Sequence, residues 1–166
     1  MRKATMGITV QGIGVVGGFG TGVEALARAL ATGESRPGLL AVPMAEGCLE
    51  LTAFRADTSR LEDFIPRRSL RRVDRYAQLG LLGAHLALAD AGLLEEDRAG
   101  MGLVLASGFG ATATTLALID SIIADSDVCA SPTHFANSLH NAAAANISMA
   151  LGATGPNLTV SQLHAS

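Results

Sequence analysis

The carboxyl-terminal part of this chain carries no charged side chain. Asp127 is the last acidic or basic residue, and no Asp, Glu, Lys or Arg occurs from Val128 to Ser166. A soluble surface normally carries charge on most of its exposed turns. We therefore expect residues 128–166 to be buried on two sides, against their own domain and against another chain.

The sequence as a whole alternates short apolar runs with helical patterns, which predicts an α/β fold. The expected strands are Ile8–Val15, Leu49–Phe54, Met101–Ala106 and Asn157–Ser161. The expected helices run from an N-cap at Thr21 to Gly33, and over residues 71–91, 112–124 and 137–151. Strands separated by helices imply a mixed sheet covered by helices, and the length of 166 residues suits one domain over residues 1–166.

Charge and cysteine content exclude several classes of function. The formal net charge of −3 gives no electrostatic case for nucleic acid. Cys48 and Cys129 form no CxxC pair, so they make neither a disulfide nor a zinc framework, and they favour the reducing cytosol. Residues 100–119 are uncharged but rich in Gly, Ser and Thr, so we expect no membrane span.

A glycine-rich turn raises an alternative function, the binding of a nucleotide. Gly12, Gly14 and Gly17 follow the first predicted strand and precede a helix, as in a dinucleotide-binding turn. That site also needs a second strand ending in an acid that holds the ribose, and here Glu34 follows the helix with no strand before it. The pattern favours a structural strand-to-helix turn, with a nucleotide-binding domain as the alternative.

The histidines are weighed as possible metal ligands. His134, His140 and His164 share the charge-free segment with Cys129, but no pair has the i, i+4 spacing of a helical metal site. We expect buried, hydrogen-bonded histidines, no metal and no cofactor. His85 is expected at the rim of the longest helix.

Four segments, in order and spacing, resemble β-ketoacyl-acyl-carrier-protein synthases, the condensing enzymes of the thiolase fold. They read ITVQGIGVVGGFGTGVEAL (8–26), RRVDRYAQLGLLGAHLALADAGL (71–93), GLVLASGFGATATTL (102–116) and SPTHFANSLHNAAAANISMALGATGPNLTVS (131–161). The resemblance is nearest to ketoacyl-synthase-like amino-terminal domains of aryl-polyene and polyketide clusters. It covers nearly all of this chain but well under half of a complete condensing enzyme, which predicts the amino-terminal part of a thiolase-like fold, incomplete at the carboxyl end.

The resemblance implies that the nucleophile is missing. In the family, the strand after Gly-Pro leads into a turn whose Cys carries the acyl chain, and His164 falls on that position here. Imidazole cannot form the stable acyl thioester that condensation requires. Gln162 and Ser166 flank the position, without a base that the sequence can supply. Two further catalytic histidines belong to a carboxyl-terminal half outside these residues.

The expected function is therefore a ketosynthase-like protein of fatty-acid or polyketide biosynthesis, acting as a non-catalytic, chain-length-factor-like partner. The alternative is an active β-ketoacyl synthase completed by further sequence or by a partner chain. The expected partners are an acyl carrier protein, a ketosynthase subunit, or both.

The resemblance also implies a homo- or heterodimer, because the family's strand before the nucleophile pairs antiparallel with its twin. An uncharged edge strand has none of the usual guards against such pairing. The expected interface residues are Asn137, Asn141, Asn157, Leu158, Thr159, Val160 and Ser161. The family's next helix fills the middle of the fold, so without it we expect open apolar faces on the strands Ile8–Val15 and Met101–Ala106.

Overall fold

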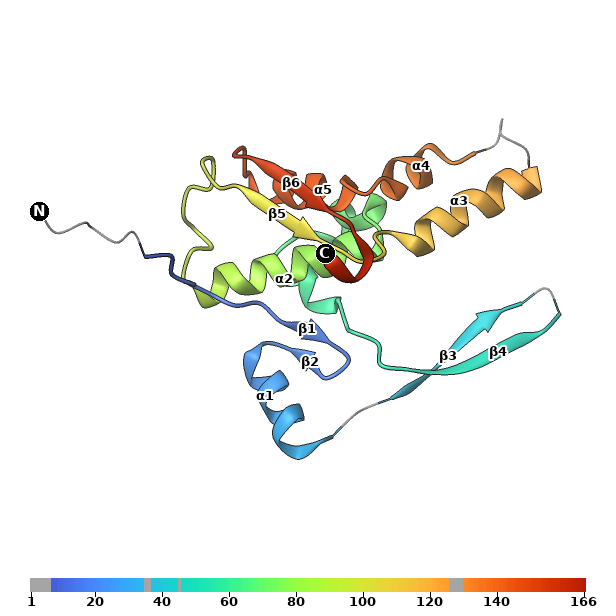
Figure 1. Cartoon of the computed structure of the whole chain (residues 1–166), viewed down its shortest axis with the longest axis horizontal. Coiled ribbons are helices and arrows are strands. Elements are labelled where there is room, and N and C mark those ends of the chain that lie inside the picture. The colour runs from blue at the N-terminus through green and yellow to red at the C-terminus, as the bar shows by residue number, and fades with distance from the viewer. Residues whose placement is uncertain (1–6, 35–36, 45, 126–129) are drawn as a thin grey trace, which may run out of the picture. The chain divides into compact units, whose positions relative to one another are not determined.

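The computed structural model describes residues 7–34, 37–44, 46–125 and 130–166 (Figure 1). It divides into two compact units. The first unit comprises the described residues up to Asp57 together with His85–Glu95, and the second comprises Thr58–Ala84 and the described part of Glu96–Ser166. Cys129 lies outside the described residues.

The first unit contains two antiparallel pairs and one complete helix. Its elements are β1 (Val16–Gly17), β2 (Gly20–Thr21), α1 (Val23–Thr32), β3 (Gly38–Pro43), β4 (Cys48–Ala53) and the end of α2 (Arg75–Asp90). β1 pairs with β2, and β3 with β4. The predicted helix before Gly33 is confirmed, and Gly33 ends it with a φ of 66° and an N–H bonded to the Ala29 carbonyl. Its N-cap is Gly22 rather than Thr21, which lies in β2.

The expected strand over Ile8–Val15 is wrong. Residues 7–15 have no regular structure, and no described strand pairs with them. Ile8 and Val10 are exposed, and the Ile13 N–H donates to the Asp90 carboxylate at 2.9 Å. An apolar run becomes a strand only beside a partner that completes its hydrogen-bond ladder. The strand predicted over Leu49–Phe54 is confirmed, since β4 covers Cys48–Ala53. β4 pairs with β3, a strand that was not predicted.

The second unit contains a parallel strand pair and most of the helices. Its elements are η1 (Ser59–Asp63), η2 (Arg67–Arg72), the first part of α2, β5 (Leu103–Ala106), α3 (Thr112–Asp125), α4 (Pro132–Ser138), α5 (Ala142–Leu151), β6 (Asn157–Val160) and η4 (Leu163–Ala165). β5 and β6 pair in parallel, from Leu103 opposite Asn157 to Ala106 opposite Val160. Helices connect these two strands, as the α/β prediction requires.

The core of the second unit lies where α2 meets α5. Ile147 of α5 is 2% exposed and contacts α2 at Gly80, where an added Cβ would lie 2.8 Å from Ile147 Cδ1. The glycine thus allows the two helices to approach closely. The other buried apolar residues of this unit are Leu61, Ala77, Leu81, Leu82, Ala111, Ala143, Ala144 and Leu151.

The rim position expected for His85 is wrong, because His85 is buried, in the first unit. It follows Leu81 by four positions and precedes Leu88 by three. It therefore lies on the buried face of α2 rather than at its edge. Gly92 ends the helix region as expected, with a φ of 70°.

The single helix expected over residues 137–151 is also wrong, because the chain breaks into α4 and α5. Ser138 Oγ donates to the Phe135 carbonyl, Leu139 is extended, and His140 and Asn141 form a turn. Serine and asparagine compete for backbone hydrogen bonds and so favour helix ends. His134 lies inside α4 rather than before it, after Ser131, which caps the helix by accepting from the His134 N–H.

Candidate functional site

The parallel strands β5 and β6 end at the same edge of their sheet. Their ladder continues one step beyond the strands, where the Ser107 N–H donates to the Val160 carbonyl at 3.0 Å. In open α/β sheets, ligands bind outside the carboxyl ends of the strands. The residues that follow both strands, 107–110 and 161–166, together with the His140 turn are therefore taken as one site, the strand-end site.

The turn after β6 is tight and strained. Leu163 has a φ of 53°, a left-handed conformation that a branched, non-glycine residue rarely adopts. Gly108 lies against this turn, since an added Cβ there would be 3.1 Å from the Leu163 carbonyl oxygen. His164 follows in η4 and is exposed. The residue that the sequence analysis placed at the nucleophile position is thus open to solvent on a strained turn.

The structure brings together two residues that the sequence analysis did not combine. His140 Nδ1 lies 3.0 Å from Ser161 Oγ, a hydrogen bond across 21 positions of sequence. Ser161 directly follows β6, and His140 stands in the turn between α4 and α5. No sequence signal indicates this pair, because the helix predicted over residues 137–151 hid the turn that directs His140 to the strand end.

Two of the expected interface asparagines are hydrogen-bonded within the chain. Asn137 donates to the Arg72 carbonyl at 2.7 Å. Asn157 donates to the Ala144 carbonyl and to Ser148 Oγ, so it ties β6 to α5. Asn141 is exposed in the turn before α5. These contacts are compatible with an interface role, which stays a prediction.

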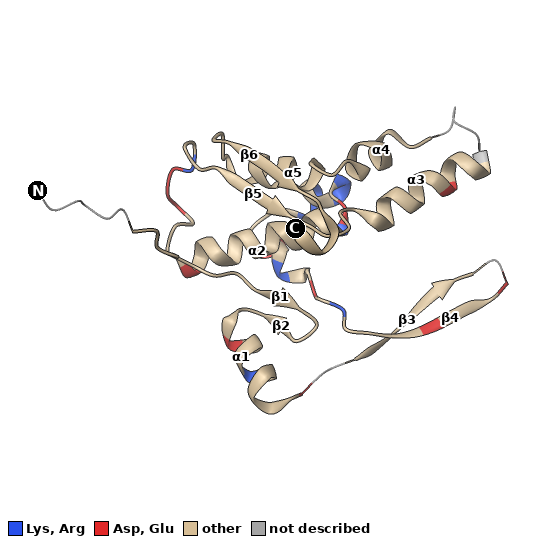
Figure 2. Cartoon of the chain, in the orientation of Figure 1, with Lys and Arg blue, Asp and Glu red and all other residues tan. Residues whose placement is uncertain are grey.

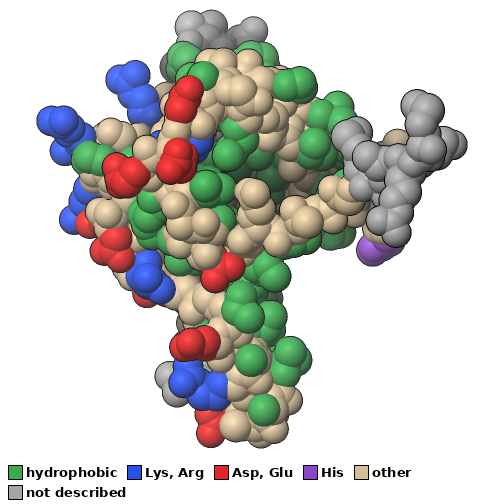
Figure 3. Space-filling view, turned by 90° about the vertical axis from the view of Figure 1, so that its left-hand side faces the viewer, with side chains coloured by type: hydrophobic (Ala, Val, Ile, Leu, Met, Phe, Trp, Pro, Cys, Tyr) green, Lys and Arg blue, Asp and Glu red, His purple; other side chains and the backbone are tan. Residues whose placement is uncertain are grey.

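One face of the β5–β6 pair is apolar and open. Val104 and Leu158 are paired neighbours on this face and are 70% and 56% exposed, and Thr159 on the other face is half-buried. Ala106 and Val160 lie on the same face as Val104 and Leu158. Among the described strands, β6 pairs only with β5, so its other edge is also open. Figure 3 shows other hydrophobic side chains at the surface, next to acidic and basic ones.

The histidines of the charge-free segment do not gather into a metal centre. Within the described residues there is no group of three or more His, Cys, Asp or Glu that could hold a metal ion. His134 is half-buried, and its Nδ1 has no hydrogen-bond partner in the described structure. His140 and His164 are exposed. His140 and His164 were expected to be buried, and this expectation is wrong.

The glycine-rich turn has a structural role in the first unit. Gly17 lies in the β1–β2 hairpin, and α1 begins only at Val23, so the described backbone lacks a strand–loop–helix arrangement at Gly12–Gly17. An added Cβ at Gly12 would lie 2.3 Å from the Ala87 carbonyl oxygen. These contacts support the structural interpretation and give no support to nucleotide binding.

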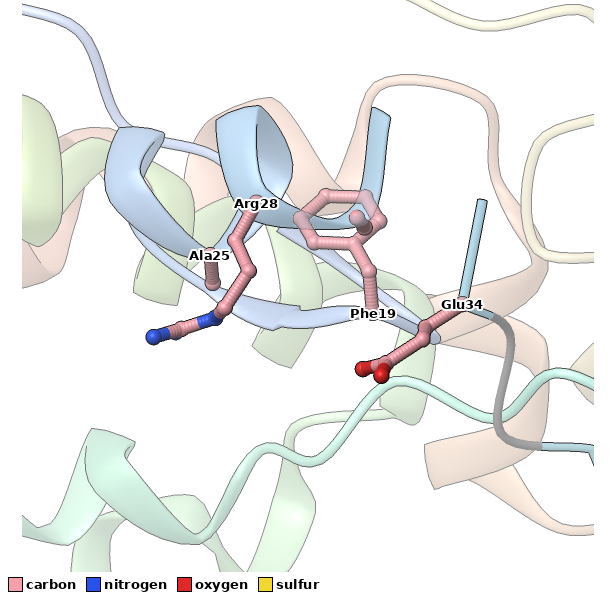
Figure 4. A pocket seen from close by; sticks show the side chains of 5 residues that line it. Phe19, Ala25, Arg28 and Glu34 are labelled. Atoms are coloured by element: carbon pink, nitrogen blue, oxygen red, sulfur yellow. The ribbon is translucent and has the colours of Figure 1, made fainter. Parts of the chain in front are cut away.

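A pocket of about 360 Å³ does occur in the first unit, on α1 rather than on the glycine turn. Phe19, Ala25, Arg28, Ala29 and Glu34 line it (Figure 4). Its lining holds one arginine, Arg28, whose guanidinium points away from the Glu34 carboxylate (Figure 4), and a single arginine is no cluster of donors for a nucleotide phosphate.

Basic side chains concentrate in one segment of the second unit. Residues 67–75, covering η2 and the start of α2, contain five arginines and one acid, Asp74 (Figure 2). Arg67 forms an ion pair with Glu62 at 3.8 Å. The Asp74 carboxylate accepts hydrogen bonds from the Ala77 N–H and the Thr114 hydroxyl. Arg68, Arg71 and Arg72 are exposed. This arginine segment gives the unit a positive surface in a chain that is acidic overall.

Two solved structures of ketosynthases share the fold of this chain. "The ishigamide ketosynthase/chain length factor" superposes with a TM-score of 0.72 at 23% identity, over 92% of this chain and 39% of that chain. A β-ketoacyl synthase from Burkholderia phymatum STM815 gives a TM-score of 0.62 at 18% identity, over 91% of this chain and 38% of that one. The expected α/β, thiolase-like fold is confirmed.

The chain belongs to the β-ketoacyl synthase family, since residues 6–166 match the family model "Beta-ketoacyl synthase, N-terminal domain". It is 26% identical over 158 residues to the 3-oxoacyl-[acyl-carrier-protein] synthase 2 of Vibrio harveyi, and 27% identical over 158 residues to that of Vibrio cholerae. Each match covers 93% of this chain but 38% of the relative, so the chain spans about two fifths of these relatives. No described helix has the length and apolar character needed to cross a membrane.

Proposed function

We propose that this chain is a ketosynthase-like subunit of fatty-acid or polyketide biosynthesis that does not itself condense acyl chains. The observation that carries the proposal is the turn after β6, where His164 occupies the position that the family resemblance gives to the nucleophilic Cys. A condensing enzyme holds its acyl chain there as a thioester on a thiolate. An imidazole at this position leaves a chain-length-factor-like role, in which the subunit shapes the product of an active partner.

The open face of the β5–β6 pair supports a ketosynthase subunit as partner. Val104 and Leu158 expose apolar surface in a segment without charge, a combination typical of an interface. One solved structure with this fold is a ketosynthase/chain length factor, which is the kind of assembly proposed here. The partner would cover this apolar face and pair with the open edge of β6, placing Asn157–Ser161 at the interface.

The arginine segment supports an acidic partner, for which we propose the acyl carrier protein. The curated relatives carry this partner in their names. Arg68 and Arg71 are exposed and have no acid next to them in sequence. A variant that combines Arg68→Glu and Arg71→Glu should bind the carrier protein more weakly, and this binding should lose its dependence on salt concentration. Arg55→Glu, an exposed change outside the segment, is the control, and equal affinity in both variants would count against the carrier protein.

The proposed function is tested by co-expression with a β-ketoacyl synthase that retains its Cys. We expect a one-to-one complex by light scattering, and we expect no β-ketoacyl product from this chain alone with acyl and malonyl thioesters. Condensation by the chain alone would favour the alternative, an active β-ketoacyl synthase that uses another residue. Failure to pair with any ketosynthase, with no condensation, would reject both.

A further inference from the structure

We propose that Ser161, with His140 as its base, accepts an acyl group from a thioester and forms a serine ester at the strand-end site. This activity goes beyond the proposed function, because it forms no carbon–carbon bond and requires no ketosynthase partner.

The geometry is that of a nucleophile and its base. His140 Nδ1 and Ser161 Oγ are 3.0 Å apart, within the range over which a base takes the proton of a hydroxyl. In the tautomer that carries its proton on Nε2, His140 accepts this hydrogen bond from the serine. The tautomer is not fixed by another hydrogen bond in the described structure, so the dyad has no orienting acid.

The position of the pair favours chemistry over a purely structural contact. Ser161 is half-buried directly after β6, at the edge where α/β sheets bind ligands, and His140 is exposed. The next turn holds Leu163 at a φ of 53°, and backbone strain of this kind concentrates at functional sites. Gly110 lies beside the imidazole, since its added Cβ would be 3.6 Å from His140 Nδ1, an ordinary van der Waals contact.

The proposed step is balanced with the thioester alone. Ser161 Oγ attacks the thioester carbonyl, and the Oγ proton moves to His140 Nδ1. The carbon–sulfur bond breaks, the proton passes from His140 to the departing sulfur, and the products are an O-acyl serine and a free thiol. No oxidant, metal or cofactor takes part.

The test incubates the full chain with the N-acetylcysteamine thioester of octanoate and follows released thiol and the intact mass. Because the two cysteines of the chain, Cys48 and Cys129, can exchange with thioesters, the experiment uses a Cys48→Ser, Cys129→Ser background, and neutral hydroxylamine removes any remaining thioester before mass analysis. We expect about one thiol released per chain and a mass gain of one acyl group less one hydrogen, on the peptide that contains Ser161.

The variants separate this proposal from its rivals. Ser161→Ala should abolish the adduct, and His140→Gln should slow its formation by about 100-fold or more, the usual contribution of a general base. Ser69→Ala, at an exposed serine outside the strand-end site, and Ser138→Ala are the matched controls and should acylate normally. An absent adduct, or one that persists in Ser161→Ala, overturns the proposal. A chain that pairs with a ketosynthase but does not acylate would leave the proposed function intact.

Discussion

At the scale of single residues, the first unit uses glycine where another backbone comes too close for a side chain. An added Cβ at Gly12 would lie 2.3 Å from the Ala87 carbonyl oxygen and 2.7 Å from the Ala91 nitrogen. Both are backbone atoms near the end of α2, and they cannot move aside without distorting that helix. The requirement at this position is steric, and it does not depend on any phosphate.

Gly12→Ala should therefore destabilise the chain by about 1–3 kcal/mol, the usual effect of overpacking. Thermal unfolding measures the change. Gly100→Ala is the matched control, because no atom lies within 4 Å of its added Cβ. Equal melting temperatures for the two variants would show that the glycine turn is not packed as described.

His164 provides the second test at this scale. His164→Cys should add an exposed thiol that iodoacetamide alkylates, in a Cys48→Ser, Cys129→Ser background, and still give no condensation. The reason is that the family resemblance implies two catalytic histidines in a carboxyl-terminal half, whereas this chain matches 38% of the curated relatives. A β-ketoacyl product formed by this variant alone would show that the single replacement is what prevents catalysis.

At the scale of elements, local patterns predicted those helices and strands whose partners lie within the chain. Gly33 and Gly92 mark the ends of α1 and the α2 region, and β5, α3 and β6 lie where apolar periodicity placed them. The strand expected at Ile8–Val15 failed because its formation depends on a neighbouring strand, which an apolar run does not report. The break at Leu139 was not predicted either, because an alanine-rich run dominates the helical pattern around it.

The same break decides how much of the candidate site could be predicted. Ser161 and the position of His164 follow from the sequence around β6. The partner of Ser161 could not be predicted, because it depends on the turn at His140 and on how that turn meets the end of β6. Contacts 21 residues apart leave no periodic trace in a single sequence.

The packing of α5 against α2 gives a test at the element scale. Ile147 is almost fully buried at Gly80, and Ile147→Ala should cost about 2–5 kcal/mol of unfolding free energy because it leaves a cavity. Chemical denaturation measures this cost. Met149→Ala, two positions along the same helix and exposed, should change the stability little. Similar losses in both variants would contradict the described face of α5.

At the scale of the whole molecule, packing within the chain accounts for only part of the absence of charge from the charge-free segment. Its α5 buries Ala143, Ala144, Ile147 and Leu151. Other apolar residues of the segment are exposed, namely Phe135, Leu139, Met149, Leu158 and Leu163. The segment thus has one apolar side that the chain buries and one that stays exposed among the described residues, and its cover by another chain stays a prediction.

The assembly prediction rests on this exposed side and on the open edge of β6. We expect the chain not to be a monomer, and Leu158→Lys or Val160→Lys should break the assembly, because burying an ammonium in an apolar ladder without a partner is strongly unfavourable. Light scattering after size-exclusion chromatography measures the mass. Ile123→Lys, an equally apolar and exposed change on α3, is the control and should leave the assembly intact. If the unmodified chain were a monomer at all concentrations, the open edge of β6 would not be a self-interface.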